Sequence, residues 1–171
     1  MNQGTLSRFV QLFTLSDAET TQRVSERLAL VLHDPAAYRQ QFAAELAERG
    51  IVAALPAQEL RDVALLDALL SEELLWESDW QDPTADLVHG INETLTQQKR
   101  AVRLTEPLGG RGAVAGPEAL DIVQELAEPA GLALVLLTLD SDSYALSVVA
   151  DAQAEEARQL ARELGFGITV Y

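Results

Sequence analysis

Two runs of strand-forming residues near the end of the chain constrain its fold more than any other feature. The first, LALVLLTL at 132–139, is apolar at nearly every position, and the second, YALSVVA at 144–150, alternates more. A short polar turn of about four residues separates them, which is the pattern of a β-hairpin. Because the first run is apolar on both of its sides, it is expected to lie at the centre of a sheet.

The segments around this hairpin predict an α+β fold. Helical periodicity and breakers indicate one helix from Pro117 to about Glu128 and another from Asp151 to about Leu164, and GITVY is expected to form a final short strand. The C-terminal third is thus a helix, strand, strand, helix, strand module (αββαβ) on a small, mainly antiparallel sheet. The fold class predicted is α+β, with a helical N-terminal half packed on this module.

The N-terminal half is predicted to be helical through residue 98. Ser16–Glu19 forms a capping box, and the pairs Asp34-Pro35 and Asp82-Pro83 each combine an N-cap with a proline at the first helical position. A further helix is expected from near Pro56 to about Trp76. Its acidic residues, Asp62 and Asp67 among them, are expected to face largely outward.

The composition changes at 99–116, KRAVRLTEPLGGRGAVAG, which is rich in glycine and arginine. This stretch is expected to be a loop or a short edge strand followed by a connection, and it is the one candidate internal junction. With 171 residues, the chain is long enough to bury one core, and we expect a single α+β domain over 1–171.

The charge of the chain restricts its partners. It has 27 acidic and 12 basic residues, for a net charge of −15, which repels nucleic acid and anionic membranes and leaves a basic protein as the expected partner. The chain has no cysteine, which excludes disulfides and thiolate metal sites, and its start lacks the features of a signal peptide, so a cytoplasmic location is expected. The sequence indicates no oligomeric state.

The segment DSDSYALSVVAD begins like a calcium-binding loop, with Asp140, Asp142 and, at the twelfth place, Asp151. An EF-hand needs an oxygen ligand at its fifth place and glycine at its sixth, where this chain has Tyr144 and Ala145. An extended backbone would also separate the ends of the segment by about 25 to 30 Å. A turn built from Asp and Ser accounts for the pattern, and a divalent-ion site on Asp140 and Asp142 alone remains as the alternative.

Common catalytic signatures are missing from the rest of the sequence. The glycine segment lacks the endings of a phosphate loop and of a dinucleotide fingerprint, and there is no G-x-S-x-G elbow. The only histidines, His33 and His89, are interpreted as structural. No cofactor is predicted, and catalysis is not favoured.

The most unusual segment is LLWESDWQDP at 74–83, which contains both tryptophans. Trp76 and Trp80 are four residues apart, so on a helix they would share one face, and acidic residues lie between and after them. One interpretation is that the two rings close the core at a helix junction. The other is an exposed aromatic and acidic surface that anchors a basic partner, and its candidate residues are Trp76, Glu77, Asp79, Trp80 and Asp82.

Two segments together resemble a bacterial family known as a domain of unknown function. Its members have a D-W-x-D segment after a helix and a D-S-Y-A-L hairpin near the end. Here these correspond to Asp79, Trp80 and Asp82 and to residues 142–146. The resemblance implies no activity, cofactor or catalytic residue.

The leading functional hypothesis is a non-catalytic, adaptor-like or inhibitor-like domain that binds another protein through the surface near Trp76 to Asp82. The alternative is a divalent-metal-dependent hydrolase or transferase that uses Asp140 and Asp142, with Tyr144 orienting the substrate.

Overall fold

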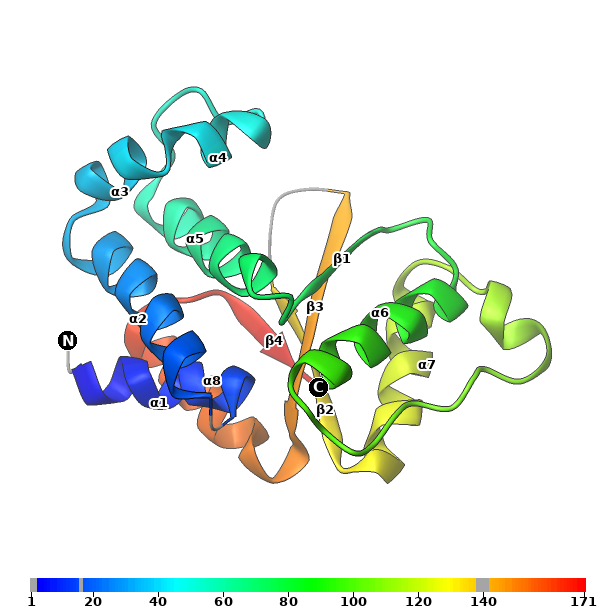
Figure 1. Ribbon diagram of the computed structural model, residues 1–171. Helices are drawn as coiled ribbons and strands as arrows, with labels where there is room; N and C mark the ends of the chain where they lie inside the picture. Colours follow the sequence, from blue (N-terminus) through cyan, green and yellow to red (C-terminus); the bar gives the residue numbers. More distant parts are fainter. Residues whose placement is uncertain (1–2, 16, 138–141) are drawn as a thin grey trace.

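The computed structural model of the chain describes residues 3–15, 17–137 and 142–171 (Figure 1). Within these ranges, helices form most of the N-terminal half, and strands are concentrated near the C-terminus. The helices are α1 Gln3–Thr14, α2 Ala18–His33, α3 Pro35–Gln41, α4 Ala43–Glu48, α5 Ala57–Ser71, α6 Thr84–Gln97, α7 Pro117–Ala127 and α8 Ala154–Leu164, and the strands are β1 Trp76–Asp79, β2 Leu132–Leu137, β3 Ser143–Ala150 and β4 Ile168–Val170.

The four strands form one antiparallel sheet in the order β1-β3-β2-β4. The predicted hairpin is its centre, with Leu132 opposite Ala150 and Leu137 opposite Ala145. The loop of the hairpin, 138–141, lies outside the described residues. The final strand pairs with β2, with Val135 opposite Val170.

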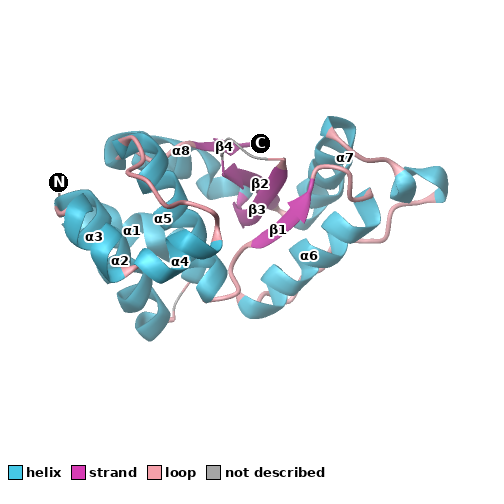
Figure 2. Cartoon of the chain, turned by 90° about the horizontal axis from the view of Figure 1, so that it is seen from above, coloured by secondary structure: helices cyan, strands magenta, loops and turns pink. Residues whose placement is uncertain are grey.

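Side chains from the two faces of the hairpin enter two separate hydrophobic clusters, because successive residues of a strand point to opposite faces. Val135 and Val149 pack with α1, α2, α5 and α8, whereas Leu134 and Val148 pack with α6 and α7. The sheet therefore lies between two helical layers, as Figure 2 shows from above. The predicted α+β class, with a helical N-terminal half and a C-terminal αββαβ module, is confirmed.

The prediction of a helix continuing to Trp76 was wrong. Helix α5 ends at Ser71, Glu73 takes a left-handed conformation with φ 60°, and Trp76–Asp79 forms strand β1 on the free edge of β3. The hydroxyl of Ser147 on β3 also donates to the carbonyl of Leu74 at 2.7 Å. Pairing with β3 satisfies backbone groups of this segment, which outweighs its local helical pattern.

Several predicted helix boundaries are close to those observed. Asp34 caps α3, and Gly50 follows α4 with a φ of 80°. Asp17 caps α2, whereas the predicted cap Ser16 lies outside the described residues. Asp82 does not cap α6, because its carboxylate accepts hydrogen bonds from the preceding strand instead.

The segment 99–116 contains no strand among its residues, all of which are described, and Gly109–Ala113 forms a 3₁₀ turn. Asn92 on α6 holds the start of the segment by donating to the carbonyl of Leu104 and accepting from its N–H, at 3.2 and 2.7 Å. No helix in the described ranges is both long and apolar enough to cross a bilayer.

Strand β1 packs directly on α6 through Trp76. The indole ring lies over Gly90, where a Cβ atom would come within 2.1 Å of Trp76 Cγ. The His89 ring meets the indole edge-on, with 5.6 Å between ring centroids. Glycine at this helical position is therefore required by the close approach of strand and helix.

We predict that Gly90→Ala destabilises the protein by about 1–3 kcal/mol, because the new methyl group overlaps Trp76 and forces β1 from α6. In a helix interior free of such contact, the same substitution would be stabilising. Urea unfolding measures the effect. The control is Gly110→Ala, where no atom lies within 4 Å of the added carbon; equal stability of the two variants would contradict the prediction.

Candidate functional site

The five residues proposed as an interaction surface lie on β1 and the turn after it. Trp76 faces α6 and is half-buried, whereas Glu77, the next residue along the strand, points to the opposite side and reaches Arg49. Asp79 and Trp80 are exposed at the end of the strand. The structure thus brings Asp79 and Trp80 together and separates Trp76 from Glu77.

The turn that carries Trp80 is fixed by its backbone on both sides. The N–H of Trp80 donates to the carbonyl of Asp142 at 2.9 Å, and its carbonyl accepts from the N–H of Gly116 at 3.2 Å. Asp82 Oδ2 accepts from Ser78 Oγ at 2.7 Å and from the N–H of Asp79 at 2.9 Å. Trp80 as a residue is nevertheless 44% exposed, so a large apolar side chain is presented on an ordered backbone.

The charge around Trp80 is negative and unbalanced. Asp79 and Asp142, whose backbones adjoin Trp80, are both exposed. Neither they nor Asp82 forms an ion pair with a cation in the described part of the chain. Exposed carboxylates without a counter-charge attract a cationic partner over several ångströms.

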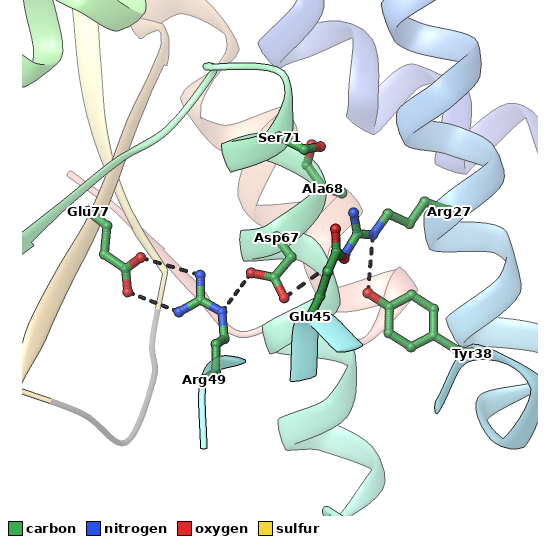
Figure 3. Close-up of polar contacts among 8 residues, drawn as sticks. All are labelled: Arg27, Tyr38, Glu45, Arg49, Asp67, Ala68, Ser71 and Glu77. Atoms are coloured by element: carbon green, nitrogen blue, oxygen red, sulfur yellow. Dashed lines mark hydrogen bonds and ion pairs between the residues drawn. The ribbon is translucent and has the colours of Figure 1, made fainter. Parts of the chain in front are cut away.

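Glu77 belongs to a polar network that the sequence did not predict (Figure 3). Arg49, which follows α4, donates Nε to Asp67 Oδ1 at 2.6 Å. Its two terminal nitrogens donate to the two carboxylate oxygens of Glu77 at 3.1 and 3.3 Å. This fork joins α4, α5 and β1, since bidentate arginine pairs fix both distance and orientation.

Arg27 on α2 forms the other half of the network. It donates Nε to the hydroxyl of Tyr38 at 3.2 Å, pairs with Glu45, and lies 4.1 Å above the ring of Phe42. Its Nη2 is 4.0 Å from Asp67 Oδ2, beyond hydrogen-bond distance, and that oxygen has no hydrogen-bond partner among the described residues. The two arginines thus flank one buried carboxylate.

Asp67 is 8% exposed, and Asp62 on the same helix is 7% exposed, so the prediction that they face outward was wrong. Burial raises the pKa of Asp67, and the ion pair with Arg49 opposes that rise. Burial likewise raises the pKa of Asp62, although Gly167 N–H and Gln58 donate to it. Periodicity alone could not show these arginine and backbone partners.

Two grooves flank the network. One, of about 450 Å³, lies between α2 and α5, and the other, of about 380 Å³, is lined by Arg49, Asp67 and Glu77 among others. Ser71 lines both, but its hydroxyl donates to the carbonyl of Ala68 at 2.9 Å. The ion pairs of Arg27 and Arg49 hold α2, α4, α5 and β1 together, and we call this network the clamp.

The alternative metal site is only partly described. Asp140 lies outside the described residues, and Asp142 is exposed with its carbonyl bonded to Trp80. In the ranges that are described, no three His, Cys, Asp or Glu side chains are grouped to hold a metal ion. The His89 ring contacts Trp76, and its Nε2 lies 4.0 Å from Oε1 of Glu93. The i,i+4 spacing of His89 and Glu93 could have indicated this second contact.

We predict that Arg49→Met lowers the free energy of unfolding by about 2–4 kcal/mol, because it leaves Glu77 without a cation and Asp67 with only Arg27, 4.0 Å away. The control is Arg8→Met, which removes a pair with Glu156 that is more exposed, with side chains 43% and 37% accessible, and should cost no more than about 1 kcal/mol. Urea unfolding of both variants at neutral pH provides the comparison, and similar losses would refute the clamp.

The same variant should respond to pH. A carboxylate whose folded-state pKa is raised stabilises the fold as pH falls, since the folded state then binds the extra proton. Without Arg49, the pKa of Asp67 rises further, so lowering the pH from about 7 to about 5 should recover part of the stability lost in Arg49→Met. Adding Asp67→Asn should remove this recovery, and its persistence in the double variant would assign it to another group.

Comparison with known proteins assigns the chain to a family. No curated protein and no solved structure matches the chain. The family described as Domain of unknown function (DUF6630) matches residues 5–171, which includes every described element from α2 to β4. The predicted membership of a family of unknown function is confirmed, and the chain belongs to the DUF6630 family.

Proposed function

We propose that this protein is a non-catalytic interaction domain of the cytoplasm that binds a basic protein through the Trp80 turn. The observation that carries the proposal is that Trp80 is 44% exposed while its backbone is hydrogen-bonded to Asp142 and Gly116. A tryptophan on an ordered turn loses little conformational freedom on binding, so more of its burial energy remains as affinity. Tryptophan is also among the residues that most often dominate binding energy at interfaces.

The charge of the site supports a basic partner over nucleic acid. Asp79 and Asp142 are exposed beside Trp80, and the whole chain has a net charge of −15. Charges at the rim of an interface mainly speed association and exclude partners of like charge. The partner that fits this surface therefore offers an apolar pocket for the indole, bordered by lysine or arginine.

The other candidate residues act as supports in this proposal. The carboxylate of Asp82 accepts a hydrogen bond from the Asp79 N–H at the end of β1, and Arg49 donates to Glu77. Gly90 leaves room for the Trp76 ring. We also infer that the whole chain, 1–171, acts as a single domain, because both helical layers pack on the same sheet. The segment 99–116 supports this inference through its bond from Gly116 to Trp80.

We predict that Trp80→Ala reduces capture of the partner from native cell lysate at least about tenfold, the effect expected of a central interface residue. Leu108→Ala is the matched control, because Leu108 is also a large exposed apolar side chain, 82% exposed, but belongs to the segment 99–116 and not to the turn. Captured proteins are quantified by mass spectrometry for wild type and both variants. A basic protein retained equally by Trp80→Ala would contradict the assigned anchor.

The acidic residues beside Trp80 can be tested separately from the indole. Asp79→Asn should weaken capture of the same partner about two- to fivefold at low salt, and the difference from wild type should shrink at high salt as the charges are screened. Glu106→Gln changes the net charge equally in the exposed 99–116 segment and should have no effect. Equal losses in both variants would mean that net charge, and not this surface, attracts the partner.

A further inference from the structure

A groove of about 470 Å³ lies on the helical layer, between α4 and the segment 51–55 that leads into α5. Nine of the ten residues that line it are apolar, and the tenth is Arg39 on α3. Leu46 and Leu60, 5% and 1% exposed, form its floor, and Val52, 91% exposed, stands at its rim. This volume is in the range of small-molecule sites.

The segment that borders the groove is entirely apolar, which is unusual in so acidic a protein. Residues 51–55, IVAAL, have no polar side chain, yet Val52, Ala53 and Ala54 are exposed. Contiguous exposed apolar surface beside a hollow marks a binding site more often than a single exposed side chain does. The groove therefore offers apolar surface to an aliphatic ligand.

Arg39 supplies the only charge in this lining. It is half-buried, and it has no hydrogen bond, ion pair or ring contact with any described residue. No carboxylate stands three or four residues from it in the sequence, whereas Arg27 and Arg49 nearby are each paired with acids. An unpaired guanidinium beside apolar surface has free donors arranged in the fork that a carboxylate matches.

We propose that this groove binds an aliphatic carboxylate, of the size of a medium-chain fatty acid, with its tail along Leu46 and Leu60 and its head on Arg39. The nine apolar residues contribute no polar side chain to satisfy the amides of a peptide, and buried amides without partners oppose binding. The acidic residues elsewhere do not prevent the binding of an anion, since salt at about 0.15 M screens charges beyond about 8 Å.

Calorimetric titration with decanoate below its micelle concentration tests the proposal, and decanol serves as the neutral probe. Wild type should bind decanoate more tightly than decanol. Arg39→Gln should weaken decanoate about fivefold or more and leave decanol within about twofold, because only the carboxylate uses the guanidinium. Val52→Asp, at a position too exposed to affect folding, should weaken both about tenfold.

Leu108→Asp places the same charge at another exposed apolar site and should change neither affinity. Circular dichroism confirms that each variant folds. Absence of decanoate binding, or equal affinities for the two probes in wild type and Arg39→Gln, would overturn the proposal. So would a wild-type dimer that Val52→Asp converts to monomer, because the groove would then be an interface between copies.

Discussion

The pairing of β1 with β3 is the interaction on which the rest of the structure depends. It joins residues far apart in the chain, with Trp76 opposite Leu146 and Asp79 opposite Ser143. Because β1 lies between α5 and α6 in sequence, its place on the sheet edge directs α5 to one face and α6 to the other. Helices α5 and α6 therefore lie on opposite sides of the sheet (Figure 1).

Strand β1 also carries acidic side chains that are held by specific contacts. Arg49 holds Glu77 on one side of β1, and Asp82 accepts from the N–H of Asp79 at its end. An edge strand resists pairing with the edge of another sheet when it carries acidic side chains and when the N–H at its end is already hydrogen-bonded. The buried carboxylate of Asp67 is paired with arginine, whereas Asp79 and Asp142 beside Trp80 are exposed to solvent.

The hairpin, the helices beside it and the final strand could be predicted because their patterns are local: an apolar run, a polar turn, proline and glycine at helix ends. Strand β1 could not, since WESD has no alternation of its own and becomes a strand by pairing with β3. The burial of Asp67 was hidden for the same reason, because its partner Arg49 lies far from it in the sequence, just after α4. The surface at Trp76 to Asp82 and the single-domain organisation stay predictions.

The sheet holds the backbone of the Trp80 turn in place, while the Trp80 side chain remains exposed. Amide hydrogen exchange at Trp80 tests this most directly, since its N–H is the bond to Asp142 that extends the β1–β3 pairing. We expect this amide to exchange at least about a hundredfold more slowly than in an unstructured peptide, as amides within the sheet do. Exchange at the rate of a free peptide would show that the turn is not held, and would contradict both the pairing and the anchor.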